Sequence, residues 1–113
     1  MEPSRKRSIV RAKPTPVRVL RAAEQLGDHI QTWRKLQGLT AQQLAERANI
    51  TRDTLRRAET GKPVGSDALL NIIRCLGQLD RLIDAVDPYE TDLGRARLGA
   101  ALPKRVRSAR TPK

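Results

Sequence analysis

Aromatic residues and cysteine are nearly missing from this sequence of 113 residues. Phenylalanine does not occur, and tryptophan, tyrosine and cysteine occur once each, as Trp33, Tyr89 and Cys75. A core with so little aromatic bulk must be built mainly from leucine, isoleucine, valine and alanine, which suits a small helical bundle. A single cysteine excludes an internal disulfide and fits a reducing cytoplasm. One cysteine and one histidine cannot make an ordinary zinc site, so neither a metal nor another cofactor is expected.

Long hydrophobic runs are missing too. No stretch approaches the roughly 20 apolar residues that cross a membrane, so no membrane partner is expected. The sequence also lacks a nucleophile–base pair and a metal-binding cluster, and Gly61-Lys62 lacks the upstream glycine of a phosphate-binding loop. These absences argue against an enzyme.

Positive charge is what the chain has in excess, with a formal net charge of +11. Residues 1–21 hold seven bases and one acid, residues 104–113 hold five bases and no acid, and residues 22–103 hold eleven of each. A neutral body with two basic arms is typical of a protein that binds a polyanion. The alternative is that the arms only keep the protein soluble. The arm residues expected to contact nucleic acid are Arg5, Lys6, Arg7, Arg11, Lys13, Lys104, Arg105, Arg107 and Arg110.

The apolar periodicity predicts an all-α fold with one domain between the two arms. Five helices are expected, over residues 22–37, 41–48, 52–60, 66–76 and 79–86. Residues 89–103 are weakly patterned, because Gly94, Gly99 and Pro103 interrupt a further helix. The predicted organisation is a flexible arm over 1–21, a domain over 22–87 and an extension with a basic tail over 88–113.

Capping residues mark the predicted helix ends. Thr40 and Gln43 have the spacing of a capping box, and Thr51 and Ser66 are expected to cap the next two helices. Asn49 is expected to take a positive φ in the turn between the second and third helices, because asparagine tolerates that conformation. Glycine is expected to end three of the helices, at Gly38, Gly61 and Gly77.

The short turn at Asn49 has a functional consequence. Ala45 and Ala48 are small, so the second and third helices can meet at a steep angle and the third can project with one face uncovered. On that face lie Arg52, Asp53, Arg56 and Arg57. A helix fits the major groove of DNA, where arginine binds guanine and a carboxylate accepts from cytosine. The alternative is a helix face that only contacts solvent.

Other side chains have less specific interpretations. Trp33 lies in the apolar stripe of the first helix and is expected in the core, rather than stacked on a base. Cys75 is expected to be a buried small hydrophobe rather than a redox sensor. Four apolar residues of the last predicted helix could belong to the core or to a dimer contact: Leu79, Leu82, Ile83 and Val86.

The stretch from Leu39 to Gly61 resembles the helix-turn-helix of the phage Cro/repressor (XRE) family. The resemblance is carried by Leu39-Thr40-x-x-x-Leu44-Ala45-Glu46-x-Ala48-x-Ile50-Thr51-x-x-Thr54-Leu55-x-x-x-Glu59-x-Gly61, and it extends from about Leu26 to Val86. It implies a compact five-helix domain like that of lambda repressor. It also implies a homodimer that binds a palindromic operator, with the third helix reading the bases.

Individual roles follow from this resemblance. Base contacts would fall to Arg52, Asp53 and Arg57, with Arg56 as a further candidate. Arg34 and Glu59 would form a structural ion pair. Two positions depart from the family pattern, since Ala41 replaces the glutamine of many members and Asn49 replaces glycine at the turn. The DNA backbone would be contacted by Thr40, Gln42, Thr51, Thr54 and Lys62.

The segment from Asp87 to Arg107 is similar to the C-terminal extension of HipB-like regulators. These are DNA-binding antitoxins encoded beside HipA-like Ser/Thr kinase toxins. The resemblance implies an autorepressor associated with the bacterial nucleoid that also restrains a kinase. The alternatives are a stand-alone phage-type or housekeeping repressor, and a non-specific nucleoid or RNA binder that acts through its arms. The extension itself could also be a plain disordered tail.

Overall fold

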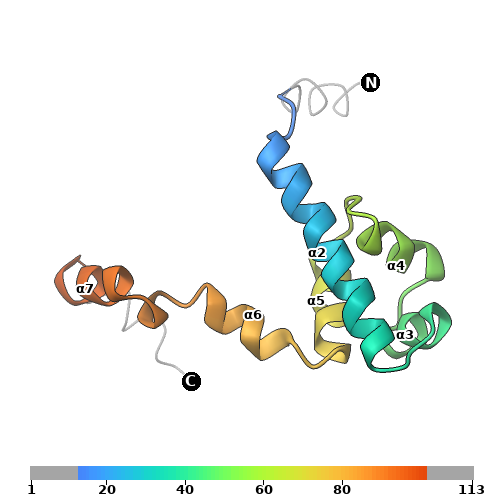
Figure 1. Cartoon of the computed structure of the whole chain (residues 1–113). Coiled ribbons are helices and arrows are strands. Elements are labelled where there is room, and N and C mark those ends of the chain that lie inside the picture. The colour runs from blue at the N-terminus through green and yellow to red at the C-terminus, as the bar shows by residue number, and fades with distance from the viewer. Residues whose placement is uncertain (1–12, 102–113) are drawn as a thin grey trace, which may run out of the picture. The chain divides into compact units, whose positions relative to one another are not determined.

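The computed structural model describes residues 13–101, and every regular element within that range is helical (Figure 1). The all-α prediction is therefore confirmed. The chain divides after Gly77 into an N-terminal unit and a C-terminal unit. The N-terminal unit contains α2 (Val17–Leu36), α3 (Ala41–Arg47), α4 (Arg52–Glu59) and α5 (Ser66–Cys75). The C-terminal unit contains α6 (Leu79–Ala85), the 3₁₀ helix η1 (Pro88–Glu90) and α7 (Asp92–Ala101).

Helix α2 begins at Val17, earlier than the predicted Ala22. Pro16 stands at the N-cap position with φ −57° and ψ 143°, and the good helix formers Leu20, Arg21 and Ala22 follow a few residues later. Val17, Val19 and Leu20 are exposed, so this end of α2 lies outside the packed stripe on which the prediction rested. The predicted arm over 1–21 is thus wrong for its last residues, and residues 1–12 lie outside the described range.

The turn between α3 and α4 forms as the sequence predicts. Thr40 Oγ1 accepts a hydrogen bond from the Gln43 amide at 3.0 Å, and the Thr40 amide donates to Gln43 Oε1 at 2.9 Å. Thr51 Oγ1 accepts from the Thr54 amide at 3.0 Å. Asn49 has φ 57°, in the left-handed region. These contacts satisfy amides that the first turn of each helix leaves free, so the Thr40–Gln43 pair fixes where α3 starts and Thr51 fixes where α4 starts.

Helix α5 starts differently from the prediction. Gly65 occupies the N-cap position with an extended backbone, and no side chain caps the helix. Ser66 is the first helical residue, so its predicted capping role is wrong. Glycine is acceptable at an N-cap because it adopts the required backbone readily and leaves the free amides open to water.

The core lies where α4 and α5 pack against the other helices of the N-terminal unit. Its most deeply buried large side chains are Leu44, Leu55, Ile72 and Leu76. Trp33 is partly buried and packs against this cluster, as predicted. Cys75 also packs against the cluster, but it is only partly buried and therefore less buried than predicted. Ala45 and Ala48 are also buried, which is consistent with their predicted place where α3 meets α4. This packing holds α4 by its apolar side and leaves its polar side outward.

Gly27 lies at a very close contact between α2 and α4. It is buried, and a Cβ added there would lie 2.6 Å from the backbone oxygens of both Ala58 and Glu59. Real Cβ atoms do not approach backbone oxygens so closely, so only glycine lets α2 contact the C-terminal end of α4 in this way.

The C-terminal unit is held by short-range contacts. The Asp87 carboxylate accepts from the Tyr89 amide at 2.9 Å and caps η1. Arg95 donates to the Tyr89 carbonyl and to Asp92, and Gly94 lies directly against the Pro88 carbonyl. Contacts between η1 and α7 support α7, which forms as a helix although it contains Gly94 and Gly99. Within the described residues, no helix is both long and apolar enough to cross a membrane.

Candidate nucleic-acid interface

The outward side of α4 carries all four side chains that the sequence singled out for base contacts. Arg52, Asp53 and Arg56 are exposed, and Arg57 is half-buried. The opposite side of the helix is buried through Leu55 and Ala58. Because the apolar side is anchored in the core, the polar side is presented to solvent on a fixed helix rather than on a loop.

Two of these side chains form an exposed ion pair. Arg56 Nη2 lies 2.8 Å from Asp53 Oδ1, and the two side chains are 76% and 65% exposed. Such a pair contributes little to stability because water screens it. The pair places a carboxylate acceptor and a guanidinium donor next to each other, and both groups keep further hydrogen-bonding capacity.

Arg52 makes a different contact, across the turn to α3. Its Nη1 donates to Gln42 Oε1 at 3.3 Å, and Gln42 Nε2 donates to Glu46 Oε2 at 2.8 Å. This chain of exposed hydrogen bonds links the first residue of α4 to the outer face of α3. It places one candidate base contact, Arg52, beside one candidate phosphate contact, Gln42.

Arg57 points to the loop that follows α4. Its Nε and Nη2 both donate to the Pro63 carbonyl, at 3.2 and 2.9 Å. The acceptor that the Arg57 side chain binds is therefore a backbone atom of the loop, whereas the acceptors of Arg52 and Arg56 are side chains.

The candidate phosphate contacts at the helix starts are hydroxyl groups. Thr40 Oγ1 accepts an amide hydrogen bond, so its own proton can be donated outward. Thr51 Oγ1 donates to Thr54 Oγ1 at 2.9 Å, so the hydroxyl proton of Thr51 is already used. The hydroxyl proton that can be donated to a phosphate at this place belongs to Thr54. Lys62 is exposed on the loop between α4 and α5. The backbone contacts predicted from the sequence thus lie at both ends of α4 and at the start of α3.

Arg34 and Glu59 tie α2 to the end of α4. Arg34 Nε donates to Glu59 Oε2 at 2.8 Å and Nη2 donates to Glu59 Oε1 at 3.2 Å. A third bond runs from Nη1 to the Leu39 carbonyl at 3.1 Å. The side chains are only 11% and 7% exposed. This bidentate pair is shielded from water and fixes the orientation of α4 on the domain.

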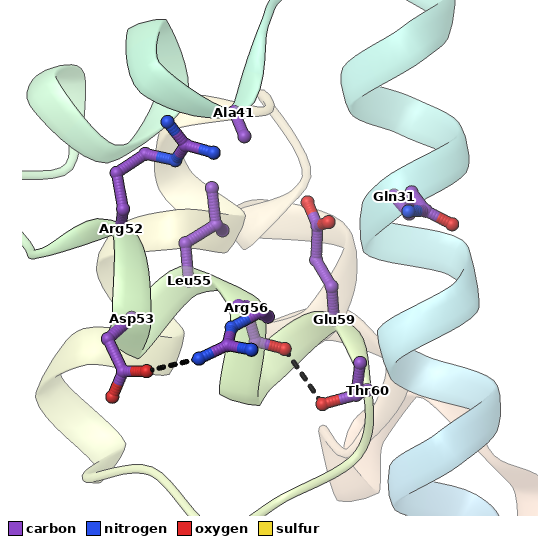
Figure 2. A pocket seen from close by; sticks show the side chains of 8 residues that line it. All are labelled: Gln31, Ala41, Arg52, Asp53, Leu55, Arg56, Glu59 and Thr60. Atoms are coloured by element: carbon purple, nitrogen blue, oxygen red, sulfur yellow. Dashed lines mark hydrogen bonds and ion pairs between the residues drawn. The ribbon is translucent and has the colours of Figure 1, made fainter.

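A cleft of about 360 Å³ borders the outward side of α4 (Figure 2). Ala41 and Leu55 contribute apolar surface, and Gln31 lies on the far side, on α2. Arg52 extends toward Ala41 in this view, and Arg56 lies beside Asp53. The small side chain at position 41 leaves this space open next to Arg52. The cleft is also lined by Arg52, Asp53, Arg56, Glu59 and Thr60.

The structure adds residues that the sequence analysis did not select. Gly27 and Pro63 position α4 and its following loop, and Gln31 and Thr60 line the cleft. A glycine inside an otherwise regular apolar stripe, between Leu26 and Ile30, is a signal that could have identified Gly27. Of the predicted arm residues, Lys13 is described and exposed, and the others lie outside residues 13–101. Over those described residues, no group of three or more His, Cys, Asp or Glu side chains could hold a metal ion.

Comparison with known proteins bears on the helix-turn-helix as a whole and not on its individual side chains. No curated protein and no solved structure shows significant similarity to the chain. A family model described as a helix-turn-helix domain matches residues 25–86, which is more than half of the sequence and includes α3, the turn at Asn49 and α4. The chain therefore belongs to the helix-turn-helix domain family, which supports a DNA-binding regulator.

Proposed function

We propose that the protein is a sequence-specific transcriptional regulator of the phage Cro/repressor type, which binds a palindromic operator as a homodimer and represses transcription. The observation that carries this proposal is the outward polar face of α4, which follows a capped, left-handed turn and is anchored by a buried apolar side. An α-helix held in this way can enter the major groove with its side chains directed at base edges.

The chemistry of the exposed side chains supports base contacts. Arginine donates two hydrogen bonds to O6 and N7 of guanine, and a carboxylate accepts from N4 of cytosine. Arg52 is the first residue of α4, and the Asp53–Arg56 ion pair begins at the next residue and spans one helical turn. Together they favour a half-site with G·C pairs at neighbouring positions. Thr40, Gln42, Thr51, Thr54 and Lys62 would hold the sugar-phosphate backbone on either side of α4.

A dimer accounts for the length of the proposed operator. Two-fold symmetry places two reading helices about 34 Å apart, which is one turn of DNA. Helix α6 has no buried residue, and its apolar Ile83 and neighbouring Val86 are exposed. These side chains are the proposed dimer contact. Leu79 and Leu82 of the same helix are half-buried.

The C-terminal unit favours an antitoxin role within this function. Tyr89 and Leu93 are exposed apolar side chains on the contiguous η1–α7 segment. Such side chains can dock on another protein, and the proposed partner is a HipA-like Ser/Thr kinase toxin. The stand-alone repressor is the alternative, and the two are separated by whether a kinase co-purifies with the chain from its native operon. A reducing bacterial cytoplasm is the proposed location.

DNase I footprinting of the purified full chain on its own promoter region tests the proposed function. We expect one protected inverted repeat at moderate salt, with half-site centres separated by about ten base pairs. Protection that spreads over any DNA with no preferred position contradicts the proposal and supports a non-specific binder that acts through its basic arms.

A further inference from the structure

Arg57 differs from the other two arginines on α4 in what it binds. Arg52 and Arg56 are exposed and donate to side-chain oxygens of Gln42 and Asp53. Arg57 is half-buried, and two of its nitrogens converge on one backbone acceptor, the Pro63 carbonyl. To reach a base edge, Arg57 would have to give up both of these hydrogen bonds.

The loop that Arg57 holds is anchored at a second place. Gly61 has φ 79°, and a Cβ added there would lie 2.9 Å from the backbone of Glu24 on α2, so the loop runs directly against that helix. The Lys62 amide donates to the Arg57 carbonyl at 2.8 Å. Lys62 therefore lies between an anchored Gly61 and an anchored Pro63, and Arg57 contributes to its placement through both its backbone and its side chain.

We propose that Arg57 is a positioning residue that fixes Lys62 relative to α4, so that the Lys62 ammonium contacts a DNA phosphate in register with the side chains that read bases. This inference rests on the proposed function and reassigns Arg57 from the base contacts to the support of a backbone contact. Its consequence is that Arg57 affects binding to all sequences in the same way, through the charge that Lys62 brings to the backbone.

A double-mutant cycle tests the inference. The variants Arg57→Ala, Lys62→Ala and the combination are prepared in the full chain, and operator affinity is measured over a range of salt concentrations. Lys62→Ala in the wild-type background is expected to reduce the slope of log K against log salt by about 0.9, because one phosphate contact is lost. In the Arg57→Ala background the same change is expected to have little effect, because Lys62 is already displaced.

The matched control is the same cycle with Arg56→Ala, because the side-chain partner of Arg56 is Asp53 rather than the loop. There the effects of Arg56→Ala and Lys62→Ala are expected to add, as they do for sites without a shared partner. Arg57→Ala is also expected to leave the base preference of the protein unchanged in a binding-site selection. Additive effects of Arg57→Ala and Lys62→Ala, or a preference relaxed at one base pair by Arg57→Ala, would overturn the inference.

Hydrogen exchange of the free protein separates this inference from the proposed function. Arg57→Ala is expected to speed exchange of the Lys62 amide, and Arg56→Ala is not. If the wild-type chain selected no operator, the proposed function would fail. The exchange rate of the Lys62 amide would still show whether Arg57 holds the loop. If Arg57→Ala did not fold, Arg57→Lys would replace it, because lysine keeps the charge but cannot form the two-nitrogen contact with the Pro63 carbonyl.

Discussion

Replacing Glu59 with alanine is expected to lower the free energy of unfolding by about 3–5 kcal/mol. The change leaves the Arg34 guanidinium in a shielded position, where it keeps its hydrogen bond to the Leu39 carbonyl but loses both bonds to the carboxylate. Water compensates only partly for the lost carboxylate, because both side chains are largely buried. Thermal unfolding followed by circular dichroism is the measurement, and the midpoint is expected to fall by about 12 °C or more.

The matched control for this prediction is Asp53→Ala. Asp53 and Arg56 form an ion pair of the same 2.8 Å length, but both side chains are mostly exposed. Its loss is expected to change the free energy of unfolding by less than about 1 kcal/mol. Equal destabilisation by the two variants would show that burial does not distinguish these pairs, contrary to our interpretation of Arg34 and Glu59 as the structural pair.

Replacing Gly27 with alanine is expected to destabilise the N-terminal unit by about 2 kcal/mol, because the added methyl group overpacks the contact between two helices. That methyl group meets two backbone oxygens at 2.6 Å, so α2 and α4 must move apart. Overpacking of this kind costs about 1–3 kcal/mol, and the obstacle here is backbone rather than an adaptable side chain. A backbone obstacle places the cost at the upper end of that range, and the higher helix propensity of alanine offsets about 1 kcal/mol of it, which leaves the expected net loss of about 2 kcal/mol. Urea unfolding of the full chain measures the difference.

Gly99→Ala provides the control for Gly27→Ala. Gly99 also lies inside a helix, but apart from its own helix backbone and chain neighbours, a Cβ there would meet no atom of the described residues within 4 Å. That variant is expected to leave the unfolding midpoint unchanged or to raise it slightly, through propensity alone. A Gly27→Ala protein as stable as the wild type would contradict the close contact between α2 and α4.

Local chemistry explains which parts of the fold the sequence could predict. The capping box at Thr40, the cap at Thr51 and the positive φ at Asn49 depend on neighbours within a few residues, and all three were predicted correctly. The predicted start of α2 was wrong because the first turns of this helix carry no packed apolar stripe. The predicted cap of α5 was wrong because glycine and serine are both suited to the N-cap, so the sequence does not show which of the adjacent Gly65 and Ser66 takes that position.

Contacts between residues far apart in the chain were harder to predict. The approach of Gly27 to the end of α4 depends on how two helices cross, which spacing within one helix does not reveal. The contact of Arg57 with the Pro63 carbonyl depends on the path of a loop. The face of α4 was predictable because a helix with one apolar side must expose the other. The roles of its side chains toward DNA remain predictions.

The central claim is that side chains on the exposed face of α4 select DNA bases, and an in vitro binding-site selection with full-length wild-type, Arg52→Ala and Arg74→Ala proteins tests it most directly. Arg74 is the control because it is an exposed arginine of α5 that donates to Asn71 within its own helix. We predict that Arg52→Ala relaxes the preference at one base pair of each half-site, with a loss of about 1–3 kcal/mol of discrimination, and that Arg74→Ala leaves the selected sequence unchanged. An Arg52→Ala protein that selects the same operator with the same preference at every position would contradict the claim.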